Sequence, residues 1–118
     1  MAAKDVLGRR GEDLAVEYLT DHGLVVLSRN WRCRDGELDV VATDQDRLVV
    51  CEVKTRSTDW FGEPAEAVTG KKAARIRRVT QAWLATHGVR WVEVRFDVVS
   101  VVAAPGRPVT VAHYEGAF

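Results

Sequence analysis

Apolar residues near the start of the chain recur with the 3.6-residue spacing of a helix, and Leu14 and Tyr18 share its apolar face. This spacing predicts a helix over residues 5–22. His22 and Gly23 fit its C-terminal end, because glycine adopts the left-handed conformation that closes many helices and a histidine ring is favoured at the negative end of the helix dipole. His22 is therefore expected to be structural rather than catalytic.

Three short strands are predicted after this helix. Residues 24–28, 37–43 and 48–55 are rich in apolar and β-branched side chains. Residues 30–36 are polar and basic, and they fit either a loop or an extension of the first strand. Residues 44–47, with the sequence Asp-Gln-Asp-Arg, are typical of a tight turn. The second and third strands are therefore expected to form a hairpin.

The second half of the chain predicts another helix and two more strands. The helical pattern covers residues 65–86, with Pro64 suited to its first turn and Gly70 as a place where it can break. Residues 89–102 alternate in a way that predicts a half-buried strand, and residues 109–114 are expected to form a last edge strand. The alternation sets an apolar face against a charged face: Val92, Val94, Phe96 and Val98 against Glu93, Arg95 and Asp97.

The order of these elements is helix, three strands, helix, strand and strand. The second helix offers a crossover connection to a further strand, whereas the first three strands are expected to be antiparallel. This order predicts an α/β fold with a mixed central β-sheet flanked by helices. The length of 118 residues fits one core, and no stretch looks like a linker, so a single domain over residues 1–118 is expected.

Composition narrows the class of protein further. Apolar residues make up 47% of the chain and charged residues 29%, as in ordinary globular domains. No secretory signal and no apolar run long enough for a membrane span is evident, so a cytoplasmic protein is expected. The spacing of Cys33 and Cys51 matches no zinc or redox motif, which favours free thiols. A formal net charge of zero argues against coating DNA by bulk charge, but it allows a local metal site.

Charged residues on the predicted hairpin fall on one face of each strand. Glu37 and Asp39 are two residues apart on the first strand of the hairpin, and Glu52, Lys54 and Arg56 follow the same spacing on the second. A four-residue turn places Asp39 directly opposite Glu52. It also places Glu37 opposite Lys54, whereas a turn of odd length would separate the two sets.

Two carboxylates side by side are a candidate metal site, because like charges opposite each other in a sheet are destabilising unless a cation or a proton lies between them. Mg²⁺ is commonly held by one or two carboxylates together with substrate phosphates. Asp39 and Glu52 are therefore candidate Mg²⁺ ligands, and Lys54 is placed to orient an attacking water or to stabilise the transition state. The competing interpretation is a solvated sheet face on which acids and lysines pair across strands.

Two residues on the predicted helices extend this cluster. Glu12 lies at the edge of the apolar stripe of the first helix, where a carboxylate points along the core rather than into water. Lys72 is in line with Ile76 and Val79, so it either snorkels to water or reaches over the sheet edge towards a phosphate. Another face of this helix is either solvated or a track for phosphates, and it carries Lys71, Arg75 and Arg78.

Five short motifs occur together along nearly the whole chain: Gly8-x-x-Gly11-Glu12, Arg29-Asn30-Trp31-Arg32, Gly36-Glu37-Leu38-Asp39, Glu52-Val53-Lys54-Thr55-Arg56 and Arg95-Phe96-Asp97-Val98. In this combination the chain resembles the YraN family of small bacterial proteins. That family is similar to the PD-(D/E)XK nuclease superfamily and, within it, to archaeal Holliday junction resolvases. The resemblance implies a restriction endonuclease-like fold.

The resemblance also implies roles for individual residues. Asp39, Glu52 and Lys54 match the superfamily motif, although Leu38 stands where that motif has a proline. Glu12 matches the acidic residue that many members carry on the first helix. Lys72 loosely matches a basic or amide residue on the helix that follows the motif.

Two interpretations of function follow. The first is a nuclease dependent on Mg²⁺ or Mn²⁺ that acts on DNA, including branched DNA, with the carbonyl of Val53 as a further metal ligand. Its expected catalytic residues are Asp39, Glu52, Lys54 and Glu12, and its expected nucleic-acid contacts are Lys72, Arg56, Arg32 and Arg75. The second is a non-catalytic module on the same scaffold that binds nucleic acid or a protein. A homodimer is expected in the first case, because junction resolvases act as dimers.

Overall fold

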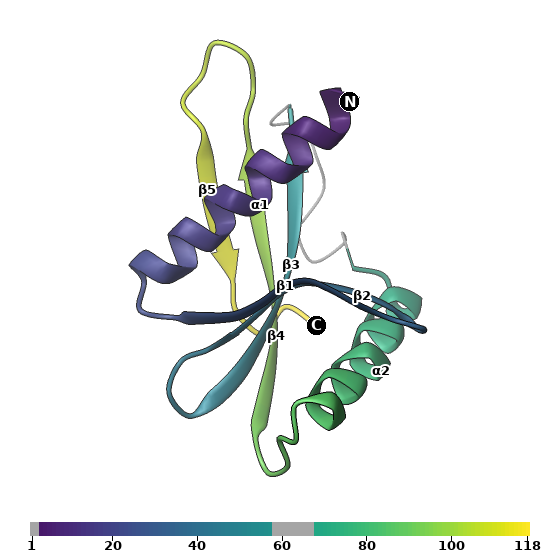
Figure 1. Ribbon diagram of the computed structural model, residues 1–118. Helices are drawn as coiled ribbons and strands as arrows, with labels where there is room; N and C mark the ends of the chain where they lie inside the picture. Colours follow the sequence, from purple (N-terminus) through teal and green to yellow (C-terminus); the bar gives the residue numbers. More distant parts are fainter. Residues whose placement is uncertain (1–2, 58–67) are drawn as a thin grey trace.

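The chain forms a five-stranded sheet and two helices over the residues that the computed structural model describes, 3–57 and 68–118 (Figure 1). The elements are α1 (Ala3–Asp21), β1 (Val25–Cys33), β2 (Gly36–Thr43), β3 (Arg47–Arg56), α2 (Gly70–Thr86), β4 (Glu93–Val102) and β5 (Thr110–Tyr114). The strands lie side by side in chain order. β3 and β4 are parallel, and the other neighbours are antiparallel. The predicted mixed α/β fold is confirmed, and it is compatible with a restriction endonuclease-like fold.

The two helices pack over different faces of the sheet (Figure 1), and a separate hydrophobic core lies under each helix. Val50 belongs to the core under α2, whereas its neighbours Val49 and Cys51 belong to the core under α1. A strand that is buried on both faces needs apolar residues at successive positions, which accounts for the apolar run at the start of β3. In the part of the chain that the structure describes, neither helix is long and apolar enough to cross a membrane.

β4 differs from the predicted half-buried strand. Residues 96–101 are all buried, because β3 pairs along the whole length of β4 and β5 pairs along its second half. Of the predicted charged face, Glu93 is exposed, whereas Arg95 and Asp97 lie largely out of contact with water. The Asp97 side chain is 0% exposed and pairs with Arg95, whose side chain is 13% exposed. The alternation of apolar and charged residues was correct, but the inference of a solvated face was wrong.

The end of α1 agrees with the prediction. Gly23 has a φ of +90°, and the N–H of Leu24 donates to the carbonyl of Leu19 at 3.0 Å. His22 Nδ1 lies 2.8 Å from the carbonyl oxygen of Tyr18, which gives this ring the structural role expected of it.

α2 begins later than predicted, at Gly70 rather than at residue 65. The side chain of Thr69 caps the helix by accepting the N–H of Lys72 at 3.2 Å. The predicted helical position of Pro64 lies outside the described residues.

For β1 the structure decides between the two alternatives that the sequence left open, and for β4 the predicted start is wrong. β1 extends to Cys33, so the polar segment after residue 28 is a strand extension rather than a loop. β4 begins at Glu93 rather than at residue 89, because the N–H of Val89 still donates to the carbonyl of Leu84 at the end of α2. The longer β1–β2 hairpin packs Leu38 into the core under α2.

Candidate functional site

The β2–β3 hairpin has the register that the sequence predicted. Val40 pairs with Cys51 and Thr43 pairs with Leu48. Asp44 closes the turn, because its side chain accepts the N–H of Arg47 at 3.1 Å. Asp39 and Glu52 come next, directly beyond the last paired residues.

Asp39 and Glu52 meet where the backbone pairing of β2 and β3 stops. The N–H of Val53 donates to Asp39 Oδ2 at 2.9 Å, so a side chain takes the place of a strand carbonyl. The N–H of Asp39 lies 3.4 Å from Glu52 Oε2 and donates to it. The two carboxylates therefore lie side by side in the opening between the strands, and we call them the acid pair.

Burial is the largest cause that raises the pKa of both acids. Burial is the largest cause for Glu52, followed by the charge of Asp39, and together they raise its pKa to about 8. Burial also raises the pKa of Asp39 to about 6, where the hydrogen bond from Val53 opposes the shift and the charge of Glu12 adds to it. Without a bound cation, the acid pair therefore keeps a proton at neutral pH.

Lys72 is the lysine that reaches the acid pair. Its Nζ lies 3.8 Å from Glu52 Oε1, and its charge lowers the pKa of both acids. The sequence left open whether this side chain snorkels to water or reaches over the sheet edge towards a phosphate; it reaches Glu52 and remains 40% exposed, and the contact with a phosphate stays a prediction. The first turn of α2 brings this side chain to the sheet.

Lys54 and Glu37 do not join the acid pair. Lys54 is exposed and forms no ion pair with the residues that the structure describes. The expectation that Glu37 lies opposite Lys54 was wrong, because β2 and β3 separate before that position. Glu37 instead faces Arg32 across β1 and β2, and their side chains form an ion pair at 3.0 Å.

Glu12 lies near the acid pair because α1 packs closely on β3. A Cβ at Gly11 would lie 1.9 Å from Thr55 Oγ1, so only glycine permits this approach. Glu12 Oε2 accepts a hydrogen bond from Asn30 Nδ2 at 3.1 Å. Asn30 has a φ of +49°, a conformation that asparagine tolerates better than most residues, but its contact with Glu12 was not predicted.

The four predicted nucleic-acid contacts lie on three different elements. Lys72 and Arg75 are on α2, whereas exposed Arg32 is on β1 and half-buried Arg56 ends β3. Arg75 is exposed, and its side chain packs near Gly36 at the start of β2.

A second polar cluster lies under α1, formed by Cys51, Asp97 and His113. Their ligand atoms lie within 4.8 Å of one another, so they are able to hold a metal ion, and they are the one such group of three in residues 3–57 and 68–118. Both oxygens of Asp97, however, already accept two hydrogen bonds each, at 2.7–2.9 Å. The donors are Arg95, His113 and the N–H of Gly116.

These hydrogen bonds make the second cluster a structural network rather than a ready metal site. Burial alone would raise the pKa of Asp97, but the hydrogen bonds from His113 and Arg95 outweigh it and lower that pKa. Burial raises the pKa of the Cys51 thiol well above its usual range, which leaves it protonated. Cys51 and Cys33 are both free thiols, as the sequence predicted.

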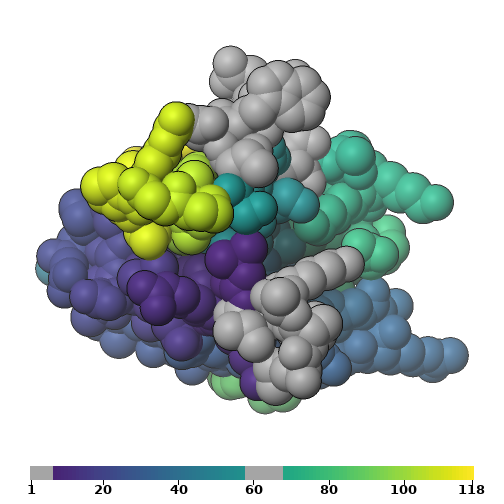
Figure 2. All heavy atoms as spheres, turned by 90° about the horizontal axis from the view of Figure 1, so that it is seen from above, coloured from purple at the N-terminus to yellow at the C-terminus, as the bar shows by residue number. Residues whose placement is uncertain are grey.

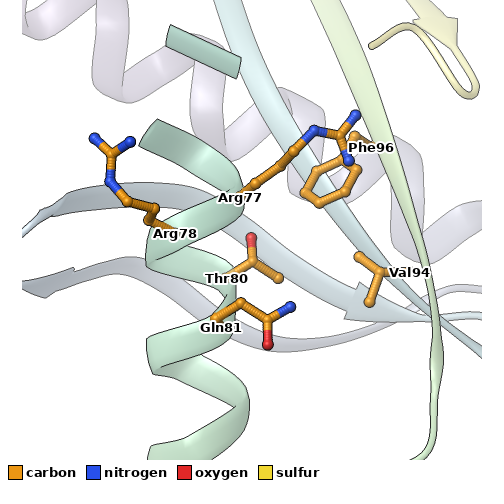
Figure 3. A pocket seen from close by; sticks show the side chains of 6 residues that line it. All are labelled: Arg77, Arg78, Thr80, Gln81, Val94 and Phe96. Carbon is orange, nitrogen blue, oxygen red and sulfur yellow. The ribbon is translucent and has the colours of Figure 1, made fainter. Parts of the chain in front are cut away.

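A hollow of about 400 Å³ lies between α2 and β4, away from the predicted site residues (Figure 3). Its floor includes Phe96, and the guanidinium of Arg77 lies 4.5 Å from the centre of that ring. The hydroxyl of Thr80 donates to the carbonyl of Ile76. These contacts occupy two of its polar side chains, and no carboxylate of the described residues lines it, so the acid pair is the stronger candidate for a metal site.

Comparison with known proteins places the chain in a family. The model of the uncharacterised protein family UPF0102 matches residues 11–101. A UPF0102 protein of Frankia alni is 57% identical over 118 residues, which are 100% of this chain and 98% of the relative. A UPF0102 protein of Kineococcus radiotolerans is 56% identical over 97% of this chain and 94% of its own length. These matches confirm the resemblance to YraN-like proteins, and the chain belongs to the UPF0102 family.

Proposed function

We propose that the protein is a nuclease that depends on Mg²⁺ or Mn²⁺ and hydrolyses phosphodiester bonds in DNA. The observation that carries the proposal is the acid pair: two carboxylates held side by side between β2 and β3, with Lys72 3.8 Å from Glu52. Such a pair is destabilising by itself, which favours a function that uses it.

The acid pair fits a hard divalent cation. Its donor atoms are carboxylate oxygens, which are the ligands that Mg²⁺ prefers. Burial and nearby negative charges raise the pKa of both acids, which means that ionising them in the folded protein costs free energy. A bound cation would lower that cost. Asp39 and Glu52 would hold the ion. The carbonyl of Val53 is a further candidate ligand, because a strand residue directs its N–H and C=O to the same side and the N–H of Val53 already meets Asp39.

A bound Mg²⁺ or Mn²⁺ would supply Lewis acidity, lowering the pKa of a coordinated water and neutralising charge on a phosphate. Three residues of the chain would orient the acid pair and adjust its charge for this chemistry. The Val53 N–H orients the Asp39 carboxylate, and Lys72 offsets the negative charge of Glu52. Glu12 acts on Asp39 through its charge and adds to the negative potential that attracts a cation.

Lys54 keeps its proposed role as a group that meets the substrate. It lies two residues beyond Glu52 on β3 and is exposed, so a phosphate docked at the acid pair would be within reach of a long side chain. Lys72 pairs with Glu52, whereas exposed Lys54 has no ion pair with the described residues, so we assign Lys72 to the acids and Lys54 to the substrate.

The resemblance to the PD-(D/E)XK superfamily supports this proposal. The mixed sheet is compatible with a restriction endonuclease-like fold, and Glu12, Asp39, Glu52 and Lys54 stand at the positions that the resemblance to the PD-(D/E)XK superfamily and its junction resolvases implies. Branched DNA and a homodimer are therefore the first substrate and assembly to test. The competing function is a non-catalytic module that binds nucleic acid or protein.

The proposal is tested by metal binding and cleavage measured on the same samples. Calorimetry with Mn²⁺ on the unaltered protein, Asp39→Asn and Glu52→Gln should show binding that either substitution weakens at least tenfold. Linear, flapped and four-way DNAs should be cut in Mn²⁺ or Mg²⁺, and Lys54→Ala should lose cleavage while retaining metal binding. Glu17→Gln, an exposed acid on α1, is the matched control. Cleavage that survives in Asp39→Asn and Glu52→Gln would exclude the acid pair as its source, whereas DNA binding without any cleavage would favour the non-catalytic module.

A further inference from the structure

A hollow of about 540 Å³ lies along the first two turns of α2. It is lined by Thr69, Lys71, Lys72, Arg75 and Arg78. Seen from above, long side chains of α2 project from the molecule on the side away from β5 (Figure 2). Four of the five lining residues are cationic, so the hollow suits a ligand with several negative charges.

The charges of α2 are unusual for a helix of this length. Residues 70–86 contain five basic side chains and no acidic one. Lys71 and Lys72 lie in the first turn, where the helix dipole disfavours cations. Thr69 would form a capping box with Glu or Gln at the position that Lys72 occupies. Lys71 and Lys72 therefore make the start of α2 less stable than acidic residues would. This indicates that the two lysines have a function other than stabilising the helix.

Of the four cations that line the hollow, only Lys72 pairs with an acid in the described part of the chain. Among the described residues, no carboxylate forms an ion pair with Lys71, Arg75 or Arg78. Arg77 differs, because it turns towards Phe96, whereas Arg78 points to the other side of the helix (Figure 3). Among residues 3–57 and 68–118, Lys71, Arg75 and Arg78 thus have no acidic partner and remain for a ligand.

Lys72 joins the hollow to the acid pair. It lines the hollow, and its Nζ lies 3.8 Å from Glu52 Oε1. A ligand in the hollow would therefore lie next to whatever binds at Asp39 and Glu52.

We infer that this hollow binds successive phosphates of one nucleic-acid strand, next to the phosphate at the acid pair. The inference rests on the proposed function and adds where the substrate backbone lies. Lys71 and Arg78 are seven residues apart, or about 10 Å along a helix. That length matches about three phosphates of one strand along a duplex axis. The guanidinium groups of Arg75 and Arg78 fit phosphate oxygens in pairs.

Salt-dependent DNA binding in EDTA tests the inference without metal or cleavage. A fluorescein-labelled 20-base-pair duplex is titrated with the unaltered protein and with the double variant Arg75→Gln, Arg78→Gln between 50 and 200 mM NaCl. Loss of two phosphate contacts should reduce the slope of log affinity against log salt by about 1.8 and weaken binding roughly tenfold or more at 50 mM. Arg9→Gln with Arg90→Gln removes two exposed cations elsewhere and should change neither quantity.

Lys71→Glu separates a binding role from a folding defect. It places an acid in the first turn of α2, so the melting temperature should rise by about 2–4 °C while duplex binding weakens. A rise in stability together with unchanged binding would overturn the inference.

Two results would overturn this inference while leaving the proposed function intact. One is an unchanged salt slope in the Arg75, Arg78 variant with metal-dependent cleavage retained. The other is equal competition by polyglutamate at the same charge concentration, which would indicate an acidic protein partner instead. A third result would separate the two proposals. If the unaltered protein binds no metal but its salt slope still depends on Arg75 and Arg78, the proposed nuclease function is wrong and the proposed binding of a nucleic-acid strand in the hollow is supported.

Discussion

Replacing Glu52 by glutamine should change how the stability of the protein depends on pH. Glutamine keeps the shape of the side chain and its ability to accept the N–H of Asp39, but it removes the ionisable proton. Glu52 has a pKa of 4.5 before burial and about 8 in the folded protein. Between these values the native state binds a proton that the unfolded chain does not, so stability falls as pH rises.

The magnitude follows from the same values. Each pH unit between them costs about 1.4 kcal/mol of unfolding free energy. From pH 5 to pH 8 the unaltered protein should therefore lose about 4 kcal/mol through Glu52 alone, and the Glu52→Gln variant should lose none of it. The difference between the two proteins should level off above about pH 9, one unit beyond the folded-state pKa, because the carboxyl is then largely ionised in both states.

Urea unfolding followed by tryptophan fluorescence measures this difference. Both proteins are unfolded in EDTA at half-unit steps from pH 5 to pH 9, with Glu17→Gln as a control that should run parallel to the unaltered protein. The reasoning is refuted if the curves of the unaltered protein and of Glu52→Gln run parallel over this range. Glu52 would then titrate like an exposed acid, and the acid pair would not exist as described.

Two further substitutions test how the site is held. Gly11→Ala places a Cβ 1.9 Å from Thr55 Oγ1, so it should cost about 1–3 kcal/mol in urea unfolding, and Thr55→Gly should restore most of the loss. If Gly11→Ala has no effect, α1 does not pack on β3 this closely. Asp97→Asn removes the fully buried carboxylate that pairs with Arg95 and His113, and it should cost about 3–5 kcal/mol while Mn²⁺ affinity stays unchanged. Loss of metal affinity in that variant would make the second cluster the metal site.

Much of the fold could be predicted because its determinants are local. The four-residue turn at 44–47 fixes the register of β2 against β3, and through it the adjacency of Asp39 and Glu52. The end of α1 is likewise set by Gly23 and its left-handed conformation. In each case the residues that decide the structure are only a few positions apart.

The errors arose where distant segments decide the outcome. The charged face of β4 looked like a solvated surface, yet α1, β5 and the C-terminal segment cover it, so Arg95 and Asp97 pair with each other. The lysine at the acid pair was expected to be Lys54, its neighbour on β3. Lys72 reaches Glu52 instead, from a helix that the crossover connection brings back over the sheet.

The sequence by itself determined the spacing of apolar residues, the turn that sets the hairpin register, and the two acids that this register brings together. The tertiary structure alone decided how deeply those acids are buried, which cation faces them, and how far their pKa values rise. The physical reason is that burial and long-range charge depend on what packs over both faces of the sheet. That packing involves α1 and α2, and neither helix is adjacent in sequence to the acid pair.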